Sequence, residues 1–124
     1  MEQEQESEIF SWKTEFPTKF AELSNGETLG YREAGESDIP LILIHGHQSS
    51  SLTFERIIKY LSPHIWCVAV CLRGFGYSTY HTPINGMKDL AADVRLFITE
   101  HLEAKEVFVL GHSLGGGVAQ ALAI

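Results

Sequence analysis

The segment with the clearest chemical potential is the pentapeptide at residues 111–115, which reads Gly-His-Ser-Leu-Gly. It directly follows an apolar run over 107–110, whose β-branched and aromatic side chains predict a buried strand. The small and apolar residues after the pentapeptide can begin a helix. In this strand–turn–helix context, the Gly-x-Ser-x-Gly pattern predicts a nucleophile elbow with the hydroxyl of Ser113 exposed at its tip.

The residue types around Ser113 fit this chemistry. Gly111 and Gly115 leave room for the backbone to fold back on itself in a turn too tight for larger side chains. We expect the turn to hold Ser113 in a strained backbone conformation, enforced by the strand and helix on either side. The following helix begins beside the hydroxyl, and its unpaired N–H groups favour negative charge that develops there.

Other glycine-rich motifs fit this segment less well. A dinucleotide-binding loop requires Gly-x-Gly-x-x-Gly, but a match begun at Gly115 ends on Gln120, and one begun at Gly111 has Ser113 in its third place. A P-loop requires Gly-Lys-Ser/Thr, which the sequence lacks. A chance Gly-x-Ser-x-Gly in a loop lacks the flanking strand and helix. The nucleophile elbow is therefore the favoured interpretation.

Length and charge narrow the class of protein. At 124 residues the chain is predicted to form one domain, and its net charge of −7 disfavours nucleic acid and anionic membranes as partners. No apolar run approaches the ~18 residues of a membrane-spanning helix. The acidic stretch at 1–8 is unlike a signal peptide. We therefore predict a cytoplasmic protein.

The two cysteines are predicted to be unpaired core residues. Cys67 and Cys71 lie in one predicted strand, where this spacing separates them by about 13 Å, too far for a disulfide. The only close pair of histidines, His45 and His47, has no neighbouring cysteine or carboxylate to complete a metal site. No cofactor and no metal are expected.

The order of the predicted elements indicates a parallel α/β sheet. Strands are expected over 19–23, 27–34, 40–44, 65–71 and 107–110, and helices over 52–61, 87–101 and from 116 onward. Asn25-Gly26 predicts a hairpin between the first two strands. After it, strand and helix alternate, which is typical of a doubly wound parallel sheet with an antiparallel N-terminal hairpin.

The helix at 87–101 shows its two faces in the sequence. The expected buried face consists of Met87, Leu90, Ala91, Val94, Phe97 and Ile98. The residues expected to stay in solvent are Lys88, Asp89, Asp93, Arg95 and Glu100.

Three motifs in register resemble the α/β-hydrolase superfamily. They are His45-Gly46, Arg73-Gly74-Phe75-Gly76 and the pentapeptide at 111–115. The likeness runs from about residue 25 to the end of the chain and is strongest for the branch of esterases, lactonases and carbon–carbon bond hydrolases. It implies the fold of that superfamily and a small-molecule acyl substrate.

The resemblance also implies roles for individual residues. Ser113 would be the nucleophile, and the backbone N–H groups of Leu114 and His47 would form the oxyanion hole. Gly111, Gly115, His45, Gly46 and Arg73 would be structural residues of the elbow and its neighbouring loops.

Two features qualify these roles. His45 is the nearest histidine that could serve as a base for Ser113, although in relatives it is more often a buried, hydrogen-bonded support of the oxyanion loop. Cys71 stands where family members often have Asp, which bears on the support of the Arg73 loop.

In this superfamily the catalytic acid and histidine follow the serine in the chain. The sequence ends at Ile124, one short helix beyond Ser113. We therefore expect an acidic tail and lead-in at 1–17 and, at 18–124, the N-terminal half of a hydrolase domain, truncated after the elbow. The missing C-terminal half would be its partner, and the chain by itself would be inactive. A truncated gene product, a short isoform and a mis-split gene model all remain open, and the alternative function is a non-catalytic binding protein or pseudogene product.

Overall fold

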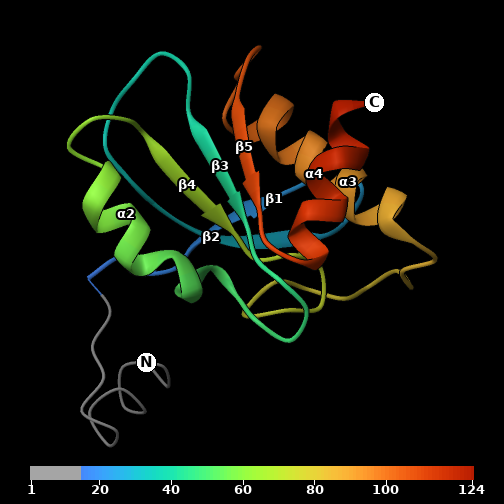
Figure 1. The fold of residues 1–124 in the computed structure, drawn as a ribbon. Coiled ribbons are helices and arrows are strands. Elements are labelled where there is room, and N and C mark those ends of the chain that lie inside the picture. The colour runs from blue at the N-terminus through green and yellow to red at the C-terminus, as the bar shows by residue number, and fades with distance from the viewer. Residues whose placement is uncertain (1–14) are drawn as a thin grey trace, which may run out of the picture.

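The computed structural model describes residues 15–124, so the predicted tail and most of the lead-in segment lie outside the described residues (Figure 1). Of the lead-in, Phe16 packs against the apolar cluster beneath the first helix, and the Glu15 N–H donates to Oε1 of Glu55 at 2.6 Å. These residues dock on the domain.

The predicted N-terminal hairpin is present. Strand β1 (Lys19–Glu22) pairs antiparallel with β2 (Thr28–Ala34). Gly26 in the connecting turn has φ of 91°, a left-handed conformation that favours glycine. The Asn25 side chain also closes the turn, because its Oδ1 accepts the Glu27 N–H at 3.1 Å.

The five strands form one sheet in the order β1-β2-β4-β3-β5. Strands β3 (Leu41–Ile44), β4 (Cys67–Val70) and β5 (Phe108–Gly111) run parallel, and β2 joins β4 antiparallel. The carboxyl ends of the three parallel strands meet at one edge of the sheet (Figure 1). The segments that follow them, which carry the predicted site residues, therefore gather at that edge.

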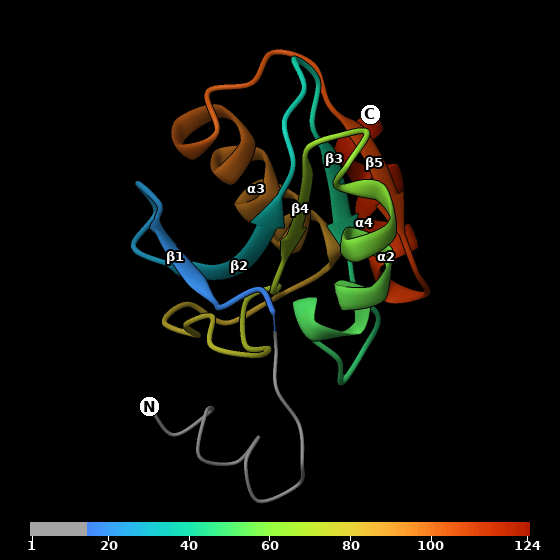
Figure 2. The same cartoon turned by 90° about the vertical axis from the view of Figure 1, so that its left-hand side faces the viewer.

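Helices cover both faces of the sheet (Figures 1 and 2). The short 3₁₀ turn η1 (Ser51–Phe54) and α2 (Glu55–Leu61) pack on the face that carries Leu43. Helices α3 (Met87–Leu96) and α4 (Leu114–Ala123) pack on the opposite face. The predicted doubly wound α/β fold with an antiparallel N-terminal hairpin is confirmed.

The helix predicted at 87–101 differs from its prediction in three ways. The α-helical part ends at Leu96, and residues Phe97–His101 form a π-helical turn. Met87, expected in the core, is 39% exposed because it lies at the first turn of α3. Asp93, expected in solvent, is completely buried because an arginine from the loop after β4 reaches it.

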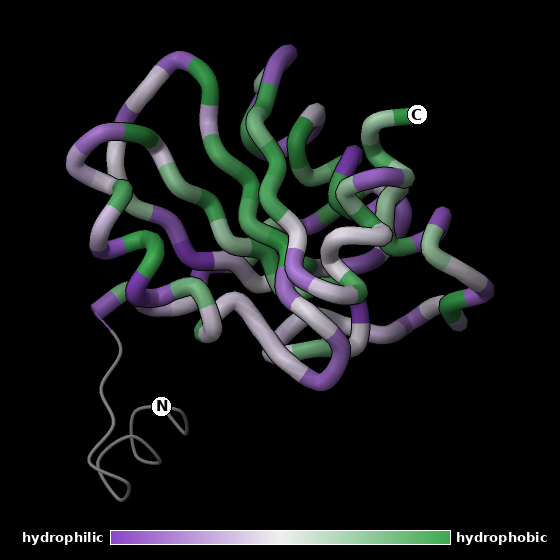
Figure 3. The backbone as a smooth tube through the Cα atoms, viewed as in Figure 1, coloured by the Kyte–Doolittle hydropathy of each residue, from purple (hydrophilic) through white to green (hydrophobic). Residues whose placement is uncertain are grey.

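Strand β5 is an edge strand with one apolar face in solvent. Phe108 and Leu110 are 56% and 42% exposed, on the same face of the sheet as their neighbours Leu41 and Leu43 in β3. The hydrophobic colour in Figure 3 continues from β3 along β5. An open edge with exposed apolar side chains is a surface through which copies of a chain associate.

We expect the Leu110→Lys substitution to reduce self-association of the 124-residue chain, because it places a charge on this exposed edge strand. Sedimentation velocity over a range of concentrations measures the effect. Tyr60→Lys is the matched control, since Tyr60 is 83% exposed but lies on α2. Equal effects of the two substitutions would mean that β5 is not the associating surface.

Candidate active site

Ser113 occupies a strained turn between β5 and α4. It is exposed, with φ of 56° and ψ of −116°, a backbone conformation that residues other than glycine rarely adopt. Backbone bonds hold the turn on both sides: the Gly115 N–H donates to the His112 carbonyl at 2.9 Å, and the Gly116 N–H to the Ser113 carbonyl at 2.9 Å. The hydroxyl therefore projects from the carboxyl edge of the sheet at the first turn of a helix.

Two glycines make this turn possible through close backbone contacts. A β-carbon on Gly111 would lie 2.1 Å from the carbonyl oxygen of Gly115. One on Gly115 would lie 2.0 Å from the carbonyl oxygen of Ile44, at the end of the central strand β3. These contacts let the first turn of α4 sit directly on the end of β3, and only glycine fits either position.

His45, the residue after β3, is completely buried and uses both ring nitrogens. Its Nε2 accepts the Leu72 N–H at 3.0 Å, so the proton is assigned to Nδ1, which donates to the Gly46 carbonyl at 2.7 Å. Burial lowers the pKa of His45, against the opposing effect of the Gly46 bond, and favours the neutral ring. The imidazole is thus committed to backbone groups rather than to the Ser113 hydroxyl.

Gly46, two residues after the end of β3, borders Ser113. A β-carbon on Gly46 would lie 3.3 Å from both Nδ1 of His112 and Cβ of Ser113. The next residue, His47, is exposed, and its ring meets Phe75 edge-on with 5.6 Å between ring centroids. The elbow therefore lies against the residues that follow β3, and the loop after β4 meets the same residues at His47.

Arg73 anchors that loop through a buried ion-pair network. Its Nη2 and Nε donate to the two carboxylate oxygens of Asp93 at 2.7 and 2.8 Å, and its Nη1 donates to the Thr82 carbonyl at 2.8 Å. The hydrogen bonds to Asp93 raise the pKa of Arg73. A second buried carboxylate, Glu27, lies 3.9 Å from Nε of Arg73. Glu27 and Asp93 were absent from the predicted site.

A family model described as the alpha/beta hydrolase fold matches residues 39–124. The chain belongs to this family. The soluble epoxide hydrolase of Corynebacterium sp. (strain C12) is 37% identical over 97 residues, which is 77% of this chain and 32% of that protein. The (E)-2-((N-methylformamido)methylene)succinate hydrolase of Acinetobacter baylyi is 29% identical over 107 residues, covering 86% of this chain and 40% of the relative.

Solved structures give the same result. An alpha/beta hydrolase fold protein from Chitinophaga pinensis superposes with a TM-score of 0.78 at 33% identity, covering 89% of this chain and 40% of that one. The epoxide hydrolase VrEH1 from Vigna radiata superposes with a TM-score of 0.78 at 26% identity, covering 87% of this chain and 34% of that one. The chain spans about a third of the length of the α/β hydrolases that it matches.

Glu27 is the most strongly perturbed carboxylate in the described part of this α/β hydrolase. Burial alone would raise its pKa, but hydrogen bonds from the Thr79 hydroxyl and from the N–H groups of His81 and Thr82, together with Arg73, lower it to about 2. The carboxylate therefore ties the hairpin turn to the loop after β4.

We expect Glu27 to make the folded chain sensitive to acid. A pKa lowered from 4.5 to about 2 contributes stability above pH 4.5 that is lost as the pH falls towards 2, up to about 3 kcal/mol. Urea unfolding between pH 7 and 2.5 should show this loss in the wild type and much less of it in Glu27→Gln. Glu36→Gln, which alters an exposed carboxylate after β2, should retain the wild-type pH dependence.

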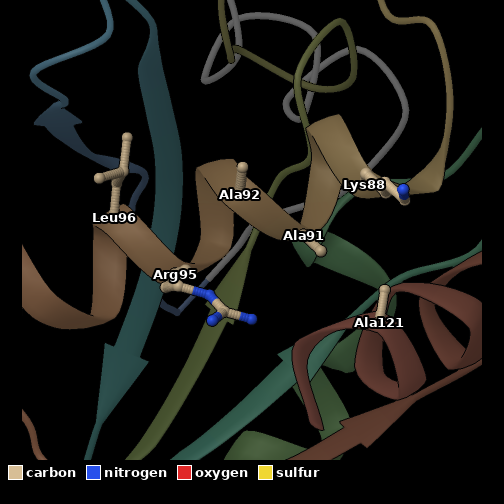
Figure 4. A pocket seen from close by; sticks show the side chains of 6 residues that line it. All are labelled: Lys88, Ala91, Ala92, Arg95, Leu96 and Ala121. Carbon is tan, nitrogen blue, oxygen red and sulfur yellow. The ribbon is translucent and has the colours of Figure 1, made fainter. Parts of the chain in front are cut away.

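A separate groove lies between α3 and α4 (Figure 4). It is lined by Lys88, Ala91, Ala92, Arg95, Leu96 and Ala121. The guanidinium of Arg95 crosses to α4 and donates to the Leu122 carbonyl at 3.1 Å. The groove follows the helix pair and contains no residue of the nucleophile turn, so it is distinct from the candidate site.

Cys67 and Cys71 are both buried and free, as predicted. Within 15–124, no group of three or more His, Cys, Asp or Glu side chains is placed to bind a metal ion. Over the same residues, no helix has the length and apolar character needed to cross a membrane.

Proposed function

We propose that this chain supplies the nucleophile and the oxyanion hole of a serine hydrolase that acts on small esters, lactones or related acyl compounds. The observation that carries the proposal is the strained backbone of Ser113, with φ of 56° between a parallel strand and a helix. A strained residue at such a turn is typical of a functional site, because the surrounding structure must enforce it.

The proposed chemistry is acyl transfer through Ser113. Its oxygen attacks the acyl carbon, the leaving group departs, and water hydrolyses the resulting ester. The N–H groups of His47 and Leu114 stabilise the oxyanion of the tetrahedral intermediate. An attack of the same hydroxyl on an epoxide carbon would leave an ether, which water does not readily hydrolyse, so acyl substrates suit this nucleophile better.

The proton acceptor for Ser113 is proposed to come from outside these residues. His45 has both ring nitrogens engaged by the backbone. In α/β hydrolases the acid and the histidine follow the nucleophile in the chain. We therefore propose that residues 18–124 form the N-terminal half of the domain, that a C-terminal half completes the triad, and that the half shown here is inactive alone. A cytoplasmic location is part of the same proposal.

A fluorophosphonate probe tests this function, since it reacts with an activated serine. The 124-residue chain should remain unlabelled and should not hydrolyse p-nitrophenyl esters above background. A chimera should be labelled at Ser113 when this chain is joined to the C-terminal part of the Corynebacterium soluble epoxide hydrolase. The same is expected with the C-terminal part of the uncharacterized hydrolase YugF of Bacillus subtilis (strain 168), which is 34% identical to this chain over 85 residues. Ser113→Ala should abolish labelling, whereas Ser49→Ala should not.

Two results would contradict the proposal. Stoichiometric labelling of the chain alone would identify a base within these residues, with His45 as the first candidate. Absence of labelling in both chimeras, each shown by a cooperative melt to be folded, would favour a non-catalytic binding protein built on the same fold.

A further inference from the structure

A series of contacts and peptide bonds joins the buried pair Arg73–Asp93 to the peptide unit that would stabilise the oxyanion. The series begins on α3, where the carboxylate of Asp93 accepts two hydrogen bonds, of 2.7 and 2.8 Å, from the guanidinium of Arg73. The side chain of Asn25 adds a third contact, donating to Oδ1 of Asp93 at 2.9 Å. A carboxylate and guanidinium held in this way have one geometry rather than several.

The loop residues next to Arg73 in the chain contact His45. Leu72, directly before Arg73, is completely buried, and its carbonyl accepts the Phe75 N–H at 2.9 Å. The Leu72 N–H donates to Nε2 of His45 at 3.0 Å. The Phe75 ring meets the His45 ring edge-on, with 5.3 Å between ring centroids. The loop therefore holds the His45 imidazole by a hydrogen bond on one side and by an aromatic contact on the other.

The imidazole in turn fixes a peptide plane. Its Nδ1 donates to the Gly46 carbonyl at 2.7 Å. That carbonyl and the N–H of His47 belong to the same planar trans peptide, so they point in opposite directions. Holding the carbonyl therefore determines where the His47 N–H points.

We propose that Asp93 and Arg73 are positioning residues of the hydrolase, which set the direction of the His47 N–H through Leu72, His45 and the Gly46 carbonyl. This inference rests on the proposed function, because it assigns the His47 N–H to the oxyanion hole. Neither residue touches the substrate. Their effect is to keep an oxyanion donor aimed before the reaction begins, which is the condition under which such a donor contributes most.

Asp93→Asn tests the proposal in the 124-residue chain without any need for catalysis. Nitrogen-15 NMR of the wild type should show His45 with its proton on Nδ1 and a single resonance for the His47 amide. In Asp93→Asn, the His45 ring should exchange between tautomers, and the His47 amide should shift or broaden. Val94→Ala is the matched control, because it removes buried apolar contacts at the next position of α3 without altering Arg73.

A kinetic measurement in the labelled chimera adds the catalytic consequence. We expect Asp93→Asn to lower kcat about tenfold or more with KM unchanged, because a misplaced catalytic group costs rate rather than binding. Arg73→Lys retains the positive charge but cannot make both hydrogen bonds to the Asp93 carboxylate. It should therefore change the His45 and His47 resonances, and kcat, in the same direction as Asp93→Asn. Arg73→Lys takes the place of Asp93→Asn as the test variant if Asp93→Asn does not fold.

The outcomes separate this inference from the proposed function. Unchanged His45 and His47 signals in folded Asp93→Asn would overturn the positioning role, whatever the enzyme does. Signals that change equally in Val94→Ala would overturn it as well, since they would report only general loosening. Absence of Ser113 labelling in the chimeras would instead overturn the proposed function and leave the NMR result standing as a property of the fold.

Discussion

The Gly115→Ala chain is expected not to reach the native fold. The added β-carbon would lie 2.0 Å from the carbonyl oxygen of Ile44 and 2.6 Å from that of His45. Neither carbonyl can move away, because Ile44 is the last residue of β3 and His45 directly follows it. β3 is hydrogen-bonded to β4 on one side and to β5 on the other. We expect a loss of more than about 4 kcal/mol of stability, a size that single substitutions reach only through such buried conflicts.

The neighbouring glycine provides the control. A β-carbon on Gly116 would meet nothing closer than 3.5 Å, and the residue lies within α4, where alanine is favoured over glycine by about 0.5–1 kcal/mol. Gly116→Ala should therefore fold and melt at the wild-type temperature or slightly above it. Urea unfolding followed by circular dichroism compares the two variants. A Gly115→Ala chain as stable as Gly116→Ala would show that the close contact between α4 and β3 is not required.

The elbow could be predicted from the sequence because its signals are local. An apolar run, a glycine at each end of a pentapeptide and a helix-forming stretch are all contiguous, so the strand–turn–helix arrangement follows without knowledge of distant contacts. The hairpin was similarly predictable, since Asn25-Gly26 encodes its own turn. The pairing of β2 with β4 is different, because it joins segments separated by three other elements, β3, η1 and α2.

Asp93 shows why the remainder of the site was missed. Its polarity placed it among the solvent residues, yet it falls three residues after Leu90 and one before Val94, on the apolar stripe of α3. A carboxylate on a buried stripe requires a cationic partner. That signal was present in the sequence, but the partner, Arg73, lies 20 residues away in a loop whose path the sequence does not determine.

His45 presents a similar case. The sequence left it as either a base or a support of the oxyanion loop. The deciding contact is the Leu72 N–H, 27 residues further along the chain, which occupies Nε2. Only the packing of the loop after β4 against the end of β3 brings these groups together.

Replacing His47 by proline is expected to lower the labelling rate and kcat of the chimera by 10²–10³, the usual effect of losing one oxyanion donor. Proline removes the backbone N–H, which is the proposed contribution of this residue, and restricts φ as well. His47→Ala retains the N–H and removes only an exposed imidazole with an edge contact to Phe75. It should keep most of the activity.

The comparison between these two variants decides which part of His47 matters. Both proteins are first compared by their thermal melts, so that a folding defect in His47→Pro is recognised before rates are measured. Ser113→Ala sets the floor of the assay, because without the nucleophile only background labelling remains. Equal losses in His47→Ala and His47→Pro would assign the effect to the imidazole and would remove the His47 amide from the proposed oxyanion hole. A large loss confined to the proline variant is the result expected if the Gly46–His47 peptide, held from behind by His45, stabilises the oxyanion.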